Sequence, residues 1–145
     1  MAAACAEIQS SIQVGESTLF GQMIAYLKKG EILLADRGFC SFHAFGKMSQ
    51  VGVDALMRLN DVRRVDFRKG KRLSLNDQLL TWKKPFKRPK GCTQEEFVAL
   101  PTTMILRHVW LTASARGHRT QTVTLVTTLL DPVVYPLQPL GELYL

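Results

Sequence analysis

Residues 30–42 read GEILLADRGFCSF. The four apolar residues 32–35 predict a short strand over about 31–36, covered on both faces as in an α/β sheet. Asp36 follows this apolar run directly, and a carboxylate at the carboxyl end of a buried strand faces the crevice where α/β sheets bind ligands. Two interpretations of Asp36 stay open. It is a metal ligand, or it is a polar residue that starts a turn, with Gly38 permitting a positive φ.

The segments on either side of this strand indicate alternating helices and strands. Residues 17–29 place apolar side chains on one helical face, and Gly30 stands where a helix commonly ends. A second helix is predicted over 41–50, with Ser41 as its cap, Phe42 and Phe45 pointing inward and Gly52 beyond its end. A strand over about 53–59 follows. The first 60 residues therefore predict a mixed α/β fold.

The second half of the chain is richer in strand patterns. The segment RRVDFRKGKRL (63–73) alternates apolar and polar residues and predicts a strand that turns into a hairpin at Lys69-Gly70. QLLTW (78–82) is expected to be either the partner of this strand or a neighbouring strand. A basic, proline-containing loop comes next, and Thr93 to Glu96 form a capping-box pattern. Two longer strands are expected over 103–113 and 119–129. The proline-rich tail is expected to become helical from about Leu140.

Positive charge is concentrated in one part of the chain. The chain has 145 residues and a formal net charge of +7. Twelve Lys or Arg residues lie between Arg58 and Lys90, against only three Asp residues. Such a block suits a polyanionic partner, nucleic acid first, although a solvated basic face explains the charge equally well.

Composition excludes several classes of protein. There is no run of about 18 apolar residues, so no membrane span is expected, and the N-terminus does not resemble a signal peptide. Cys5, Cys40 and Cys92 are odd in number and lack CxxC pairing, which predicts neither a disulfide framework nor a zinc site and favours a reducing cytoplasm.

Other chemically active side chains give weaker signals. His43 is expected on a helix surface, His108 within a strand and His118 in a turn, with no two histidines at metal-ligand spacing. Cys40 has no base near it in the sequence. Trp82 lies inside the basic block, where it either stacks on a nucleic-acid base or packs in the protein; packing is the commoner role of an aromatic residue on a strand.

Four segments in order, ILLADRGFCS (32–41), RVDFRKGKRL (64–73), WKKP (82–85) and TTLLDP…YP…ELY (127–144), resemble the DDE transposases of the insertion-sequence-four type. The resemblance runs from about Glu16 to Tyr144. It implies a partial ribonuclease H-like catalytic core over 1–60, a β-rich basic insertion over 61–130, and a linker with the start of the catalytic helix over 131–145. In this family an Asp-Asp-Glu triad binds two Mg²⁺ ions, and the enzyme cuts the ends of a mobile element and joins them to target DNA.

The resemblance also assigns roles to individual residues. Asp36 resembles the second catalytic aspartate and hence a Mg²⁺ ligand, Arg37 the arginine that often follows it, and Tyr144 the tyrosine that opens the Tyr-Arg-Glu-Lys helix motif. The DNA-contacting residues expected on this basis and from the charge pattern are Arg37, Arg63, Arg64, Arg68, Lys69, Lys71, Arg72, Lys83, Lys84 and Tyr144.

The other two triad members have no counterpart in these 145 residues. One carboxylate does not hold two Mg²⁺ ions, so the chain alone is expected to lack transposase activity. The strand 32–35 is also expected to lack neighbours and to leave a sheet edge open. The expected setting is the bacterial cytoplasm and nucleoid, with DNA as partner, and with a full-length transposase or a second copy of the chain as further partners. A non-enzymatic DNA-binding or interfering fragment is the alternative.

Overall fold

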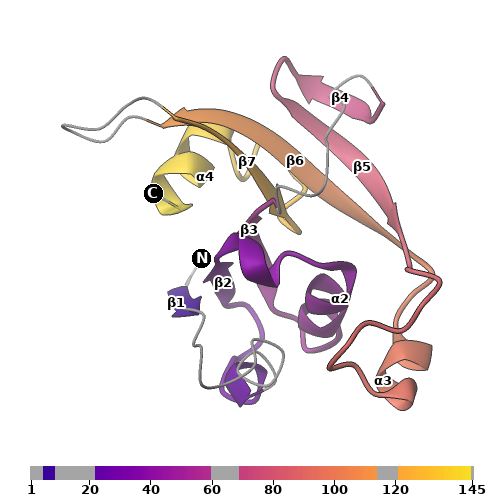
Figure 1. Ribbon diagram of the computed structural model, residues 1–145. Coiled ribbons are helices and arrows are strands. Elements are labelled where there is room, and N and C mark those ends of the chain that lie inside the picture. The colour runs from indigo at the N-terminus through magenta and orange to yellow at the C-terminus, as the bar shows by residue number, and fades with distance from the viewer. Residues whose placement is uncertain (1–4, 9–21, 60–68, 114–120, 145) are drawn as a thin grey trace.

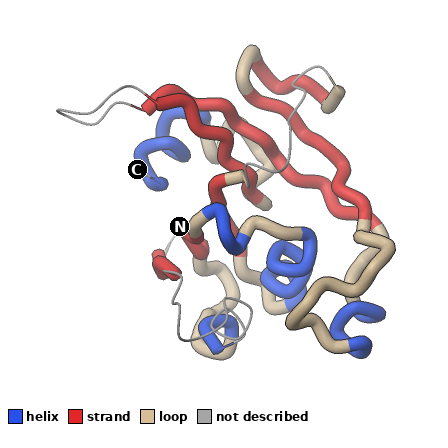
Figure 2. Tube along the Cα trace, viewed as in Figure 1, coloured by secondary structure: helices blue, strands red, loops and turns tan. Residues whose placement is uncertain are grey.

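The computed structural model describes residues 5–8, 22–59, 69–113 and 121–144. They form one seven-stranded mixed sheet in the order β1-β2-β3-β7-β6-β5-β4, with helices packed against it (Figures 1 and 2). The mixed α/β class predicted from the sequence is confirmed. The elements are β1 Cys5–Ile8, β2 Ile32–Ala35, the 3₁₀ turn η1 Arg37–Phe39, α2 Phe42–Gln50, β3 Asp54–Arg58, β4 Lys71–Ser74, β5 Asp77–Lys83, α3 Gln94–Ala99, β6 Thr103–Ala113, β7 Gln121–Thr127 and α4 Leu137–Tyr144.

The sheet has a parallel part and an antiparallel part. Strands β1, β2 and β3 run parallel, while β3 pairs with β7 in antiparallel fashion, as do all the remaining neighbours. Strands β5 and β6 form a long curved ladder across the molecule, and the chain between them carries α3 (Figure 1). Because β3 pairs directly with β7, the sheet continues across the expected division at residue 60, which itself lies outside the described residues.

Both faces of the sheet are covered at β2, as its unbroken apolar run predicted. Leu33 and Ala35 point into a core built with the buried face of α2. Ile32 and Leu34 point to the opposite face, which is covered by α4 and the segment leading to it. Adjacent residues of β2 thus enter different cores, and each must be apolar for that reason.

Most of the predicted elements are confirmed with small shifts. Strands β2, β3, β6 and β7 and helix α2 lie within one or two residues of their expected bounds. Phe42 and Phe45 are buried, and the Ser41 hydroxyl caps α2 by accepting from the Ala44 amide at 3.1 Å. Thr93 caps α3 in the same manner through the Glu96 amide. These elements have strong local signals and needed no tertiary information.

The helix expected over 17–29 differs from the structure where residues are described. Residues 22–24 are helical, but the chain then turns, with the Tyr26 and Leu27 amides bonding three residues back. Gly30 adopts φ +90° and donates its amide to the Gly52 carbonyl, which fixes the approach to β2. Residues 17–21 lie outside the described part.

The expectation of an open edge at β2 is wrong. Strand β1 pairs with β2 in parallel register from Cys5↔Ile32 to Ile8↔Ala35, and β3 pairs with it on the other side. The sequence pattern of the N-terminal segment was too short to predict β1. In the basic region the chain turns at residues 69–70, as expected, while the strand expected before Lys69 lies outside the described residues. Strands β4 and β5 form a hairpin that turns at residues 75–76.

Helix α4 starts at Leu137, three residues before the expected position. Pro139 falls in its first turn, where a missing amide hydrogen costs little because that amide has no helical partner. Gly141 faces Leu111 of β6 so closely that a Cβ there would lie 2.8 Å from a Leu111 methyl group. This glycine permits the close packing of α4 on the sheet.

A buried ion pair fixes the segment before α4. The Arg107 guanidinium bonds both carboxylate oxygens of Asp77, at 2.8 and 2.6 Å, and its third nitrogen donates to the carbonyls of Leu129 and Tyr135, at 3.2 and 2.6 Å. Asp77 is 3% exposed and Arg107 is fully buried. The pair therefore connects β5, β6 and the chain that leads into α4.

Among the described residues, no helix has both the length and the apolar character needed to cross a membrane.

Candidate functional site

The first candidate site is the carboxyl end of β2. Asp36 is exposed there, and its carbonyl accepts from the Phe39 amide at 3.0 Å as the chain enters η1. The local backbone is thus a turn, as one interpretation predicted, but Gly38 does not adopt the positive φ that this interpretation invoked, because it lies within the 3₁₀ turn η1. The structure does not test the other interpretation, in which the exposed Asp36 carboxylate is a metal ligand.

Tyr144 lies at the same end of β2. Its hydroxyl donates to the Ala35 carbonyl at 3.2 Å, although the two residues are 109 positions apart. Burial raises the pKa of Tyr144, and the nearby negative charge of Asp36 raises it further, while Arg58 acts in the opposite direction. The first and the last of the four segments that resemble the transposase family, 32–41 and 127–144, are therefore in contact through this hydrogen bond.

The residues around Asp36 do not fit a two-magnesium centre. Among the described residues, only His43, Cys92 and Glu96 form a group of three potential metal ligands, and Asp36 is not part of it. Mg²⁺ prefers oxygen ligands in octahedral geometry, and two such ions need several carboxylates. No metal-dependent step can be built on Asp36 with the residues described.

Some of the expected DNA-contacting residues form an exposed basic edge. Lys69, Lys71 and Arg72 are exposed at the start of β4, and Lys83 is exposed at the end of β5. A cavity of about 330 Å³ lies beside them, lined by Lys69, Gly70, Lys71, Leu79, Leu80, Thr81 and Ile105. Arg63, Arg64 and Arg68 lie outside the described residues, as does the side chain of Arg37.

Lys84 has a different environment from the other basic residues. Its ammonium donates to the Leu100 carbonyl at 3.1 Å and lies 4.6 Å from the centre of the Phe97 ring. These contacts join Lys84, which lies between β5 and α3, to Phe97 of α3 and to Leu100 just after it. Lys84 therefore has structural contacts within the protein, and its role as a DNA-contacting residue stays a prediction.

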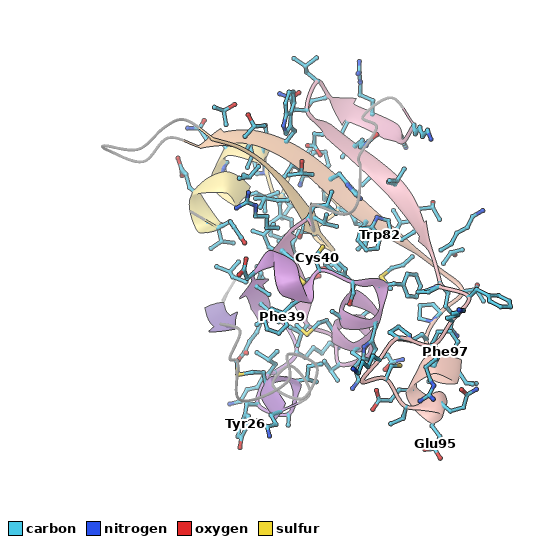
Figure 3. The ribbon with its side chains drawn as sticks, viewed as in Figure 1. Tyr26, Phe39, Cys40, Trp82, Glu95 and Phe97 are labelled. Carbon is cyan, nitrogen blue, oxygen red and sulfur yellow. The ribbon has the colours of Figure 1, made fainter. Side chains whose placement is uncertain are left out.

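Trp82 belongs to the core. It is 5% exposed, packs edge-to-face on Phe45 with ring centres 5.7 Å apart, and donates its indole N–H to His108 at 2.8 Å (Figure 3). A base cannot stack on a ring covered in this way. The packing interpretation of Trp82 is therefore the one that the structure supports.

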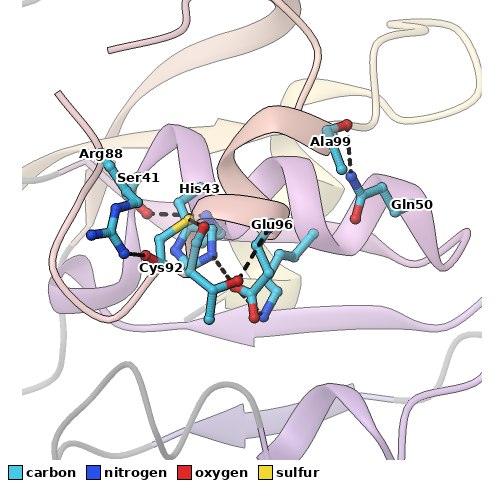
Figure 4. A network of polar contacts seen from close by, with 10 residues as sticks. Ser41, His43, Gln50, Arg88, Cys92, Glu96 and Ala99 are labelled. Carbon is cyan, nitrogen blue, oxygen red and sulfur yellow. Dashed lines mark hydrogen bonds and ion pairs between the residues drawn. The ribbon is translucent and has the colours of Figure 1, made fainter. Parts of the chain in front are cut away.

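The second candidate site was not predicted from the sequence. His43 in the first turn of α2, Cys92 before α3 and Glu96 in α3 bring their donor atoms within 4.8 Å of one another (Figure 4). His43 Nε2 lies 3.4 Å from Glu96 Oε2, and the Lys47 ammonium lies 3.1 Å from the same oxygen. Neither approach has hydrogen-bond geometry, although both His43 Nε2 and Glu96 Oε2 are shielded from solvent.

The charges in this cluster oppose one another. Burial lowers the pKa of His43, and Lys47 lowers it further, against the effect of Glu96. Burial also raises the pKa of the Cys92 thiol, with Glu96 adding to the shift. The contact with Lys47 is the main reason that the pKa of Glu96 is lowered. Sequence spacing gave no signal for this group, because 49 residues separate His43 from Cys92.

Comparison with models of known protein families gives no match for this chain. The curated protein sequences likewise contain no significant match.

Proposed function

We propose that this chain is a DNA-binding part of a DDE transposase of the insertion-sequence-four type. The observation that carries the proposal is the hydrogen bond from Tyr144 to Ala35. In the family that the sequence resembles, the second catalytic aspartate follows a core strand, and the tyrosine motif opens the catalytic helix. The counterparts here, Asp36 and Tyr144, lie at the same end of β2.

The mixed sheet is compatible with this proposal. The family has a ribonuclease H-like core with a β-rich insertion, and here three parallel strands continue into four antiparallel ones. The proposed counterpart of the core is the parallel part with α2, and that of the insertion is the β4–β7 ladder. The exposed lysines at the start of β4 then lie in the insertion.

DNA binding is proposed at the basic edge of β4. Lys69, Lys71 and Arg72 present adjacent positive charges, and electrostatic contact with phosphates needs no base-specific geometry. The neighbouring segment 60–68 adds three more arginines to the sequence of this region. We place the binding partner in the bacterial nucleoid, and a full-length transposase or a second copy of the chain is a compatible protein partner.

The chain alone is not expected to cut or join DNA, because among the described residues Asp36 belongs to no group of three potential metal ligands. Mg²⁺-dependent cleavage of duplex DNA by the purified chain, lost in Asp36→Ala, would contradict this part of the proposal.

The binding test compares two variants of equal charge. Lys69→Gln/Lys71→Gln neutralises the basic edge, and Lys28→Gln/Lys29→Gln removes the same charge from exposed lysines before β2. Fluorescence anisotropy with a labelled duplex, repeated over a range of salt concentrations, should show the logarithmic salt slope reduced by about two in the first variant only. Equal losses in both variants would mean that affinity follows net charge, and the proposed edge would be wrong.

A further inference from the structure

The cluster of His43, Cys92 and Glu96 lies on the α2 face of the sheet, apart from the β2 end and the basic edge. The three residues come from three segments that the fold brings together: the first turn of α2, the loop after Arg88, and the first turn of α3. We propose that these three side chains bind one zinc-class divalent ion, with a fourth position open to water.

The donor set selects the class of metal. One imidazole nitrogen, one thiol sulfur and one carboxylate oxygen match Zn²⁺, which takes nitrogen, sulfur and oxygen ligands in tetrahedral sites. Mg²⁺ and Ca²⁺ prefer oxygen ligands throughout and are disfavoured by the cysteine. The site therefore differs in chemistry from the magnesium centre expected of the transposase family.

The distances are close to those that a metal needs. Zinc bonds of about 2.0–2.3 Å place tetrahedral ligands roughly 3.3–3.8 Å apart. The donor atoms of this cluster already lie within 4.8 Å of one another, so side-chain rotations of about 1 Å close the site.

Two shielded atoms in the cluster face each other without a hydrogen bond. His43 Nε2 and Glu96 Oε2 are 3.4 Å apart, and neither atom has a hydrogen-bond partner. The carboxylate oxygen is an acceptor, and a neutral imidazole with its proton on Nδ1 offers a lone pair at Nε2. A metal ion satisfies both atoms together with the Cys92 sulfur.

The backbone around the cluster is held in place. The Arg88 guanidinium donates to the Cys92 carbonyl at 2.8 Å, and the Cys92 amide bonds the Pro89 carbonyl at 3.2 Å. Gly91 adopts φ +84°, which lets the chain turn just before Cys92. The hydroxyl of Thr93 caps α3, so Glu96 starts from a fixed first turn. These contacts position two of the ligands in advance of binding.

Lys47 competes with the metal for Glu96. Its ammonium lies 3.1 Å from the carboxylate oxygen that faces His43, so an incoming ion must displace it. Removal of this lysine should therefore strengthen metal binding, whereas removal of a ligand should weaken it. This pair of opposite effects is specific to a metal at this position.

The consequence of binding would be a cross-link between α2 and the loop that joins β5 to β6. Helix α3 has six residues, none of them buried. An ion held by His43 of α2 and by Cys92 and Glu96 would attach the segment between β5 and β6, which contains α3, to the core.

Isothermal titration of the full chain with ZnCl₂, and absorbance spectroscopy with Co²⁺, test the proposal. We expect one ion per chain and a Co²⁺ spectrum with a thiolate charge-transfer band. Cys92→Ser should abolish that band and lower affinity by at least about tenfold, and Glu96→Gln should weaken binding, because each removes one ligand. Cys40→Ser, which removes the other buried cysteine among the described residues, should leave both measurements unchanged.

Lys47→Met is the second arm, and it does not depend on whether a ligand variant folds. We expect it to raise zinc affinity several-fold, because it removes the ammonium that competes for Glu96. The control variant Lys28→Met removes an exposed lysine that is not part of the cluster and should leave zinc affinity unchanged. Circular dichroism verifies that each variant folds. The proposal is overturned if Cys92→Ser binds zinc as the unchanged chain does, or if Lys47→Met and Lys28→Met have the same affinity.

Discussion

In the described part of the chain, the Asp77–Arg107 pair and the group around Glu96 each bring a carboxylate against a cation, and they differ in how many of their polar atoms make hydrogen bonds. In the Asp77–Arg107 cluster both carboxylate oxygens and three guanidinium nitrogens make hydrogen bonds, and both side chains are buried. In the second cluster one oxygen of Glu96 faces both Lys47 and His43, and neither contact is a hydrogen bond.

This difference separates a structural pair from a candidate binding group. A buried ion pair is stable only when every donor and acceptor is satisfied, and exchange of a partner is then costly. A cluster at the edge of the core, with acceptors that lack hydrogen bonds, can exchange a cation at little cost. Substitution of Arg107 should therefore cause a large loss in the free energy of unfolding, whereas substitution of Glu96 should cause a small one.

The largest expected effect is at the satisfied pair. Arg107→Met leaves the Asp77 carboxylate buried without its partner, and we expect a loss of about 3–5 kcal/mol in the free energy of unfolding. Chemical denaturation followed by circular dichroism measures it. The Asp77→Leu/Arg107→Met double variant, which removes both charges, should recover a large part of the loss. A single variant that loses less than about 1 kcal/mol would show that the pair is not the structural tie described above.

The sequence predicted the elements with local signals and missed the contacts that join them. The unbroken apolar run of β2, the Ser41 cap and the Thr93 cap each depend on a few adjacent residues, so they were recovered with errors of one or two positions. Strand β1 is four residues long, and its pairing with β2 depends on the tertiary fold. No local pattern distinguishes such a strand.

Both polar clusters depend on contacts that are far apart in the sequence. Arg107 lies in the apolar run MILRHVWL, and a single charge in such a run was a usable signal for a buried partner, although nothing indicated Asp77. His43 was judged by its spacing to other histidines, a criterion that cannot find Cys92 and Glu96. The approach of Tyr144 to the β2 end came from the fold as well, since 109 residues separate the bonded groups.

A smaller effect is expected where α4 meets β2. Tyr144→Phe removes one hydrogen bond of a half-buried hydroxyl, which should cost about 1 kcal/mol. The pKa of Tyr144 is raised in the folded chain, so this stabilisation is present below the ordinary tyrosine value of 10 and is lost as pH rises through the folded value.

Denaturation at a series of alkaline pH values tests this dependence. The difference in unfolding free energy between the unchanged chain and Tyr144→Phe should be constant below pH about 10 and should decrease above it. A difference that grows with pH would mean that the hydroxyl ionises more easily in the folded chain, contrary to the burial and the Asp36 charge around it.

The smallest effect is expected at the cluster that lacks hydrogen bonds. In metal-free protein, Glu96→Gln should change the free energy of unfolding by no more than about 0.5 kcal/mol, because a third of the Glu96 side chain is exposed and solvent screens its contact with Lys47. The pKa of Glu96 is lowered in the folded chain, so even this small contribution should be present above about pH 4.5 and lost as the pH falls.

Glu95→Gln is the matched control, since it removes the same charge from the same turn of α3 without a partner at Lys47. Denaturation with a chelator present measures both variants. A loss at Glu96 as large as that of Arg107→Met would place the two clusters in the same structural class and remove the contrast between them.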